Sequence, residues 1–583
     1  MTSMSVLRQP ETSGATVSPT VTPARSRSDD LRARGEPAVW LLGGALALGC
    51  MMIVGLLTLI LWSGLATFVP QPIVVVTDTA GQVWAGEETR SELYRPEPEV
   101  IAALPPDARA AIVDGGGFAS RTLYRLGNYD LYGEDFKWIS DFETASRTTP
   151  QDFVHIERTE WGPFIGRLTA MTIDGVETAA TSVRNPAFIA AHELARQRRL
   201  QIHKIENDDI GAINARIEQA RLRVRKVELD SGRDSEDYRA AVGNFELQSK
   251  SLTDLYTARA AEAETLANAN KGYFATLEDV RGESKIIPLE SIVRVFPSND
   301  LSVIDKIQIY AARWWEFLSD EPREANTEGG IFPALFGTFT MTLLMVVAVA
   351  PFGVITALYL REYAKQGRFV ALVRICVNNL AGVPSIVYGV FGLGFFAYVV
   401  GGGIDQIFYP ERLPSPTFGT GGLLWSSLTL ALLTVPVVIV ATEEALSAVP
   451  RSTREGSLAC GASKWQTIKY VVLPRAMPGI LTGIILAMAR GAGEVAPLML
   501  VGVVKLAPAL PIDGLFPFVH LERSFMHLGF HIYDVGFQSR NSEAGKPMVF
   551  VTTLLLLTLV FAMNLTAITI RNRLKKRFMV GAF

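Results

Sequence analysis

The sequence predicts a polytopic α-helical membrane protein that carries a mixed α/β domain outside the membrane. Three observations lead to this fold class: six long apolar stretches, basic residues concentrated in alternate loops, and one long segment whose apolar periodicity changes. Hydrophobic residues make up 49% of the 583 residues and charged residues 19%. Because this composition is too apolar for a soluble domain and too charged for membrane helices alone, soluble and membrane-embedded parts must alternate.

Six stretches are long enough to cross a bilayer, which takes about 20 apolar residues in a helix. They span residues 38–61, 331–360, 377–400, 422–441, 479–501 and 548–570. The first stretch is too long for the core of a signal peptide, so we expect a retained anchor within residues 38–69. The polar tail before it, residues 1–37, lacks apolar periodicity and is predicted to be disordered.

The distribution of lysine and arginine predicts the orientation of these stretches. Basic residues cluster in the N-terminal tail, after the second stretch, between the fourth and fifth stretches, and near the C-terminus. The loop 401–421 contains only Arg412, whereas residues 503–546 hold several basic residues and fit the alternation less well. Because basic loops face the cytoplasm, we expect both termini inside, including a short tail at 576–583, and residues 70–330 outside.

Residues 70–330 are predicted to fold as a domain of their own. Apolar and polar residues alternate in 70–185 and again in 273–297, which is typical of strands. Between these parts, at about 188–270, apolar residues recur every three or four positions, which predicts an antiparallel helical hairpin with a coiled-coil-like seam. The seam consists of Ile210, Ile213, Ile217, Ala220, Val224 and Val227.

The three cysteines, Cys50, Cys376 and Cys460, all lie outside this domain. Its stability must therefore come from a packed core and not from disulfides. The sequence contains neither a CxxC pair nor a histidine-rich spacing that would suggest a metal site, and it has no GxxxxGK[ST] phosphate-binding loop. We therefore expect no catalytic residue, metal or bound cofactor in this chain.

The loop at residues 451–474 carries several helix signals in a short space. Ser452 and Glu455 have the spacing of a capping box, which satisfies free N–H groups at a helix start. Gly461 suits the left-handed position that ends a helix. Ser463 and Gln466 then repeat the start signal.

Trp465, Ile468 and Val472 share one helical face in the second half of this loop, and Pro474 closes the segment. The loop is therefore predicted to form two short amphipathic helices joined at a fixed bend. One interpretation is that these helices only lie on the inner face of the membrane. The other is that they present a rigid surface to a partner.

The order of Glu455, Gly461 six residues later, and Leu473 followed by proline resembles the EAA loop of ABC importer permeases. In that family the loop is a coupling helix that docks on a separate cytoplasmic ATPase. The resemblance implies coupling roles for Ser452, Glu455, Gly461, Ala462, Trp465, Leu473 and Pro474. Gly456 departs from the family pattern, which prefers alanine there, and a glycine should weaken this helix by up to about 1 kcal/mol.

Four segments resemble, more specifically, the PstA-type permease subunit of the phosphate ABC importer. They read FPALFGTFTMTLL, AGVPSIVYGVFGL, TEEALSAVPRSTREGSLACGASKWQTI and LPRAMPGILTGIILAMARGAGEVAPLML. The resemblance covers residues 331–575 and implies a permease core with five of the six transmembrane helices in a bacterial inner membrane. Residues 70–330 would then be a large periplasmic insertion.

The same resemblance implies a set of partners. They are a PstC-type second permease, a PstB-type ATPase dimer and a periplasmic phosphate-binding protein. ATP and Mg²⁺ would bind the partner ATPase, so the chain is expected to be a transport subunit and not an enzyme. A phosphate-signalling sensor is a further candidate partner, and no nucleic-acid partner is expected. The insertion could dock the binding protein, brace the second permease, report occupancy to a sensor, or act as a spacer.

Charged and polar residues within the apolar stretches are candidates for a substrate path. Arg490 and Glu494 lie four residues apart and would share a helical face, where each charge costs about 2.5–3.5 kcal/mol at mid-membrane. Arg490 could contact an oxyanion through its planar guanidinium while Glu494 holds it, or the two could form a purely structural pair. Secondary candidates, which could equally bond one helix to another, are Thr338, Thr340, Asn378, Asn379 and Ser385.

Two alternatives to phosphate import follow from the sequence. Val440 stands where many relatives carry arginine, so the substrate could be another oxyanion such as sulfate or molybdate. The chain could also be a non-transporting scaffold or sensor for phosphate signalling, although an intact coupling loop favours transport. Homodimeric and heterodimeric pairing of the permease are both compatible with the sequence.

Overall fold

The computed structural model describes residues 37–180, 182–514, 516, 518–539 and 542–580. The chain divides into two compact units, residues 1–59 and residues 60–583. The tail predicted to be disordered lies outside the described residues except for Pro37, and so do residues 581–583. In the first unit, the described residues belong to helix α2 (Pro37–Ala66), whose apolar side chains are exposed, as suits a helix surrounded by lipid.

The second unit contains a separate α/β domain, which confirms the predicted fold class. Its first sheet is antiparallel, in the order β4-β3-β2-β1-β5. The strands are β1 (Ile73–Asp78), β2 (Val83–Tyr94), β3 (Ala119–Arg125), β4 (Phe136–Ser140) and β5 (Thr144–Thr148). Short helices α3 (Pro98–Ala103), α4 (Pro106–Asp114) and α5 (Tyr129–Tyr132) connect them. Val76, Trp84 and Leu126 form part of the core beneath this sheet.

The second sheet of this domain is assembled from two distant parts of the chain. Its order is β10-β9-β7-β6-β11, with β8 paired to β7. The strands are β6 (Val154–Arg158), β7 (Phe164–Ile173), β8 (Val176–Ala179), β9 (Phe274–Glu278), β10 (Ser284–Pro288) and β11 (Ile292–Phe296). Leu168 pairs in register with Leu277, and both are buried with Phe164 and Phe188 in one apolar cluster. The residues between β8 and β9 therefore leave the sheet and return to it.

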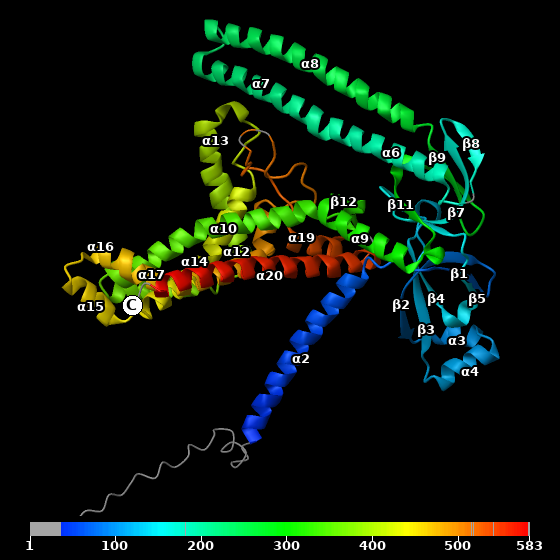
Figure 1. The fold of residues 1–583 in the computed structure, drawn as a ribbon, viewed down its shortest axis with the longest axis horizontal. Helices are drawn as coiled ribbons and strands as arrows, with labels where there is room; N and C mark the ends of the chain where they lie inside the picture. Colours follow the sequence, from blue (N-terminus) through cyan, green and yellow to red (C-terminus); the bar gives the residue numbers. More distant parts are fainter. Residues whose placement is uncertain (1–36, 181, 515, 517, 540–541, 581–583) are drawn as a thin grey trace, which may run out of the picture. The chain divides into compact units, whose positions relative to one another are not determined.

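A long helical hairpin forms this excursion. Helix α6 (Pro186–Lys204) continues through a π-helical turn, η2 (Ile205–Ile210), into α7 (Gly211–Ser231), and α8 (Glu236–Asn270) returns beside α7. Figure 1 shows α7 and α8 side by side. Ser235 caps α8 by accepting a hydrogen bond from the Tyr238 amide at 3.1 Å. Only Ile213 and Ala220 of α7 are buried, because a two-helix pair can cover one narrow stripe of each helix.

Helix α9 (Val303–Ser319) leads from the α/β domain towards the membrane helices. A capping box between Ser302 and Asp305 starts it. Trp314 packs edge-on against Phe68, with ring centroids 5.1 Å apart, whereas Trp315 is 73% exposed. A short link with the two-residue strands β12 (Pro322–Arg323) and β13 (Glu328–Gly329) joins α9 to the next helix.

Six helices among the described residues are long and apolar enough to cross a membrane, as predicted. They are Trp40–Ala66, Phe332–Tyr363, Ser385–Phe408, Leu423–Ser447, Lys464–Ala492 and Glu543–Lys576. The second begins as α10 (Phe332–Leu358) and ends in η6 (Tyr359–Tyr363), and the third comprises α12 (Ser385–Phe391), η7 (Gly392–Gly401) and α13 (Gly402–Phe408). The fourth is α14 (Leu423–Ser447), and the sixth lies in α20 (Ser542–Val580).

Two predicted spans have the wrong ends. The third was predicted at 377–400 but begins at Ser385, because Gly382 and Pro384 separate it from the amphipathic helix α11 (Arg368–Leu380). The fifth was predicted at 479–501, but its main helix, α17 (Leu473–Ala492), stops at Ala492, and a separate short helix, α18 (Ala496–Val501), follows. In both places an apolar run continues across a backbone break that hydropathy does not detect.

The helices α10, α14 and α17 pack together as the centre of the membrane part. Met341, Leu430 and Ala487, one from each helix, are buried in a single apolar cluster. Small residues allow the close approach: a Cβ added at Gly483 would lie 2.5 Å from the Ala441 Cβ. Helix α14 is thereby held between its neighbours, and the loop after it starts from a fixed point.

Candidate functional site: the loop between the fourth and fifth membrane helices

The loop after α14 is a bent pair of short helices. Helix α15 (Arg451–Ala459) is followed by a bend, then by α16 (Lys464–Thr467) and the π-helical turn η9 (Ile468–Val472). Gly461 forms the bend with φ of +85°, a conformation that favours glycine, and its amide donates to the Leu458 carbonyl at 3.0 Å.

The second of the two predicted helix starts is confirmed. The Ser463 hydroxyl accepts a hydrogen bond from the Gln466 amide at 3.2 Å. The Gln466 side chain accepts one from the Ser463 amide at 2.8 Å. This reciprocal capping box fixes the direction in which the chain leaves the bend.

The first predicted helix start and the predicted stop are both wrong. Helix α15 already begins at Arg451, after Pro450, so Ser452 lies inside the first turn and no side chain caps the helix. Ser452 and Glu455 are exposed. Pro474 does not end the segment, because it occupies the first turn of α17, where a proline needs no intrahelical N–H partner. The loop therefore runs without interruption into the fifth membrane helix.

Arg454 anchors the loop to the ends of two membrane helices. Its guanidinium donates to the Leu446 carbonyl at 2.6 Å and to the Val449 carbonyl at 2.8 Å, at the C-terminal end of α14. It also pairs with Glu362, in η6 at the end of the second membrane helix, at 3.1 Å. The two charged side chains are only 18% and 13% exposed. A cation near helix C-termini is favourable because the free carbonyls there carry partial negative charge.

Further contacts close the bend and pack its inner face. The Ser457 and Thr467 hydroxyls lie 3.0 Å apart across the bend. Ile468 and Val472 are buried, and Val472 joins a cluster with Leu446 at the end of α14. These contacts hold the loop as one body with the membrane helices.

The outer face of the loop presents three large, exposed apolar or aromatic side chains among polar ones. Leu458 is 48% exposed, Trp465 57% and Tyr470 66%. The helical spacing predicted that Trp465 shares one face with Ile468 and Val472. This prediction is wrong, because Trp465 is exposed and the other two are buried. Ala462 is half-buried beside the bend, and Leu473 is half-buried at the start of α17. A rigid surface with large exposed apolar side chains is typical of a protein docking site.

Arg490 and Glu494 lie at the far end of α17. The Arg490 Nε and the Glu494 Oε1 are 3.5 Å apart, with 39% and 22% of their side chains exposed. Glu494 was predicted inside the fifth span, and this placement is wrong. The helix α17 ends at Ala492, and Glu494 lies in the break before α18. The pair is formed across the end of α17, where the Glu494 amide donates to the Gly491 carbonyl at 3.3 Å.

The secondary polar candidates do not converge on this pair in the described contacts. Thr338 is fully buried; its hydroxyl donates to the Ala334 carbonyl at 2.7 Å and accepts from the Leu528 amide at 2.9 Å. Thr340 is also buried, and Ser385 is half-buried at the first turn of α12. The bonds of Thr338 link two segments of the chain, which favours the helix-to-helix interpretation for this residue.

Asn378 and Asn379 were predicted in the third span, and this placement is wrong. Both are exposed near the end of α11, which lies outside the six apolar helices. The sequence also gave no indication of an ion pair between Arg374, on α11, and Glu443, on α14, at 3.2 Å. Arg454 and Glu362 were missed likewise, although charged residues at the ends of apolar spans were a usable signal.

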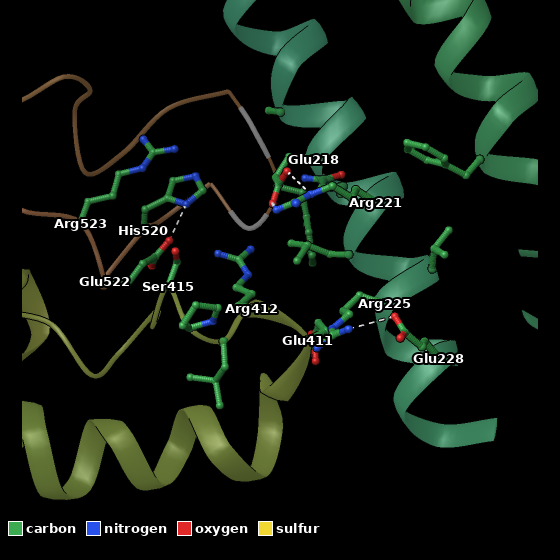
Figure 2. A pocket seen from close by; sticks show the side chains of 18 residues that line it. Glu218, Arg221, Arg225, Glu228, Glu411, Arg412, Ser415, His520, Glu522 and Arg523 are labelled. Atoms are coloured by element: carbon green, nitrogen blue, oxygen red, sulfur yellow. Dashed lines mark hydrogen bonds and ion pairs between the residues drawn. The ribbon is translucent and has the colours of Figure 1, made fainter. Parts of the chain in front are cut away.

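A cavity of about 790 Å³ lies between α7 and two loops of the membrane part (Figure 2). Four arginines and four glutamates line it, so their charges balance. Arg221 pairs with Glu218 at 2.9 Å, and Arg225 with Glu228 at 3.0 Å. Because each arginine charge is balanced by a glutamate charge, the cavity has no excess of positive charge that would favour binding of an anion. The described residues also contain no group of three or more histidine, cysteine or acidic side chains placed to hold a metal ion.

These features define a multi-pass membrane protein with an anchored loop between its fourth and fifth apolar helices. Residues 349–576 match the family described as binding-protein-dependent transport system inner membrane component. The chain is 32% identical over 235 residues to the probable ABC transporter permease protein YqgI of Bacillus subtilis, covering 40% of this chain and 74% of that protein. The chain belongs to this family of inner-membrane transport components, whose members are not enzymes.

Two further relatives place the chain within the family. The probable ABC transporter permease protein YqgH of Bacillus subtilis is 32% identical over 203 residues, 34% of this chain and 62% of that protein. The phosphate transport system permease protein PstA 1 of Mycobacterium tuberculosis (strain H37Rv) is 38% identical over 190 residues, 32% of this chain and 56% of that protein. The predicted resemblance to PstA-type permeases is thus confirmed for the membrane part, and the chain spans less than two thirds of two of these three relatives.

Proposed function

We propose that this chain is the transmembrane permease subunit of an ATP-driven importer of inorganic phosphate, coupled through residues 451–474 to a separate ATPase. The observation that carries the proposal is the construction of that loop: a bent helix pair, anchored by Arg454, with Leu458, Trp465 and Tyr470 directed outward. The names of the PstA relatives support phosphate as the substrate.

The continuity of the loop with α17 supports a mechanical route from the loop to the other end of that helix. The loop continues into α17 without a break, and the 20 residues of α17 extend about 30 Å at roughly 1.5 Å per residue. A displacement of the loop by an ATPase would therefore be passed along α17, in which Pro478 interrupts one backbone hydrogen bond. Arg490 lies near the distal end of α17 and Glu494 in the break that follows it, so both would be displaced by such a movement.

Arg490 is our candidate for the contact with the substrate anion. Its guanidinium can donate two parallel hydrogen bonds to a phosphate, and Glu494 at 3.5 Å would orient it and reduce its field so that the anion is released. The Arg490 side chain is 39% exposed, which leaves donors available. Thr338, Thr340 and Ser385 remain secondary candidates for lining the path.

The proposal includes the partners of such an importer. A second, PstC-type permease would complete the path, a PstB-type ATPase dimer would bind ATP and Mg²⁺, and a phosphate-binding protein would deliver the anion. The termini and the loop would then be cytoplasmic and the α/β domain periplasmic. The same proposal includes a signalling sensor as a partner. It also includes a role for the α/β domain in docking the phosphate-binding protein.

The native Cys460, exposed beside the bend, allows the orientation to be tested directly. In a variant with Cys50→Ala and Cys376→Ser, a membrane-impermeant maleimide should label Cys460 in inside-out vesicles and not in intact spheroplasts. Cross-linking from Cys460 to the co-expressed ATPase should follow, and Trp465→Ala should weaken it. Labelling from the outer side would overturn the coupling proposal.

The substrate is tested separately, by uptake of radioactive phosphate into cells that carry the complete transporter. Uptake that unlabelled phosphate suppresses, and sulfate or molybdate does not, would support phosphate import. Suppression by sulfate or molybdate at equal concentration would assign the chain to another oxyanion. Labelling of Cys460 from the inner side without any uptake would favour the scaffold or sensor alternative.

A further inference from the structure

The link between α9 and α10 contains the one run of successive non-glycine residues with positive φ among the described residues. Glu324, Ala325 and Asn326 have φ values of 44°, 53° and 77°, and none of them is glycine. Side chains with a Cβ avoid this left-handed region, and three in succession persist only where the surroundings fix them. The two outer residues of this turn are fixed from opposite sides.

Glu324 holds the turn to the α/β domain. Its Oε1 accepts a hydrogen bond from the Gly162 amide at 3.1 Å, in the turn between β6 and β7. That turn is itself rigid, because the buried Arg158 donates to the Gly162 carbonyl and to the Trp161 carbonyl, each at 2.9 Å. Arg158 also pairs with Asp130 at 3.0 Å. Glu324 therefore grips a part of the domain that has little freedom to move.

Asn326 holds the same turn to the membrane part. It is 1% exposed, and its Nδ2 donates to the Asp534 Oδ2 at 3.0 Å and to the Lys505 carbonyl at 3.3 Å. Asp534 is also 1% exposed and pairs with the Lys505 Nζ at 3.1 Å. A buried carboxylate with an ion pair and an amide donor has one favourable arrangement, so this end of the turn is fixed as well.

Asp534 belongs to a short, partly buried segment that reaches the second membrane helix. This segment consists of α19 (Leu528–Tyr533) and η10 (Asp534–Gln538). Its first amide, that of Leu528, donates to the Thr338 hydroxyl on α10 at 2.9 Å. Leu528 and Val535 are buried together with Phe317 of α9 and Ile331. A continuous set of contacts thus runs from the α/β domain through the strained turn to α10.

We propose that Glu324 and Asn326 are positioning residues of a rigid strut, through which the α/β domain sets the position of the α19–η10 segment. The strut is the turn Glu324–Asn326 with its two anchors. A protein that binds and shifts the α/β domain would thereby move the α19–η10 segment next to Thr338. The regulatory purpose rests on the proposed import function, whereas the coupling itself is a property of the chain.

The test uses hydrogen–deuterium exchange of the full-length protein in lipid nanodiscs. Glu324→Ala removes only the contact with the α/β domain, yet amides of residues 528–538 in the membrane part should exchange about five- to tenfold faster, since a charge-assisted hydrogen bond is lost. Glu324→Gln keeps an acceptor for the Gly162 amide and should restore slow exchange. Glu321→Ala, the loss of an exposed acid in the same link, is the matched control and should change exchange less than twofold.

Coupling between two sites is reciprocal, which provides a second measurement. Asn326→Ala removes only side-chain hydrogen bonds to the membrane part. It should nevertheless accelerate exchange of amides 160–166 in the α/β domain by a similar factor. Unchanged exchange at 528–538 in Glu324→Ala, or equal acceleration in Glu321→Ala, would overturn the proposal. Neither measurement needs substrate or transport, so a failure of the import function would appear in the uptake assay and leave this result intact.

Discussion

Replacement of Arg454 by alanine should release the loop at residues 451–474 from the membrane helices. The change removes donations to two carbonyls of the α14 end, at 2.6 and 2.8 Å, and the ion pair with Glu362 at 3.1 Å. An exposed ion pair is worth at most about 1 kcal/mol, whereas breaking a buried one costs about 3–5 kcal/mol. Because both side chains retain 13–18% exposure, we expect a loss of about 2–4 kcal/mol in the local stability of the loop.

This loss corresponds to a roughly 30- to 800-fold increase in the opening equilibrium, at about 1.4 kcal/mol per tenfold. Hydrogen–deuterium exchange of amides 451–472 in lipid nanodiscs measures it directly. Arg451→Ala removes the same charge from an exposed position of the same helix and should leave exchange within about twofold, as a surface charge with no buried contact does. Glu362→Gln should give an intermediate increase. Equal exchange in Arg454→Ala and Arg451→Ala would show that the anchoring contacts do not hold the loop.

Four further predictions concern other parts of the chain. Gly461→Val should destabilise the bend by about 1–2 kcal/mol, because Gly461 has a φ of +85°. Gly456→Ala should stabilise α15 by up to about 1 kcal/mol, because open space surrounds this position. The amide exchange rates of the loop should therefore rise in the first variant and fall in the second. Leu277→Ala, at a fully buried site of the second sheet, should lower the unfolding free energy of the α/β domain by about 2–5 kcal/mol, visible as a lower midpoint in a urea titration. Burial raises the pKa of Glu157, but the neighbouring arginines outweigh this effect and lower the pKa to about 2. The ionised Glu157 therefore stabilises the fold by about 3 kcal/mol above a pH of about 4.5, and this stabilisation is lost as the pH falls from about 4.5 to about 2. Glu157→Gln should remove this part of the pH dependence of unfolding. Arg490→Ala should reduce phosphate uptake at least about tenfold while Arg490→Lys retains part of it, and normal uptake by a stable alanine variant would exclude Arg490 from the path.

The number of membrane helices could be predicted because hydropathy is a sum over about 20 residues and tolerates local irregularity. The ends of the third and fifth helices could not, since they depend on single backbone positions. Pro384 starts a new helix inside an apolar run, and the helix of Arg490 stops at Ala492 although apolar residues continue. Asn378 and Asn379 were misplaced for the same reason.

The loop shows the same division on a smaller scale. Ser463 and Gln466 form the predicted capping box, because its two hydrogen bonds depend only on local spacing. Ser452 and Glu455 have equivalent spacing but form no cap, since the helix starts after Pro450, two residues earlier than that pattern requires. The contacts of Arg454 could not be predicted from local spacing, because its partners lie at the ends of two other helices.

The sequence by itself determined the six apolar helices, the α/β domain with its hairpin, and the bent loop before the fifth helix. These features follow from interactions between residues close in the chain, or from the average polarity of a segment. Both can be recognised by inspecting one stretch of sequence at a time. The tertiary structure decided which side chains meet: Arg454 with Glu362, Arg374 with Glu443, and Asn326 with Asp534. Contacts between residues 69 to 208 positions apart depend on how whole helices pack, and no local pattern contains that information.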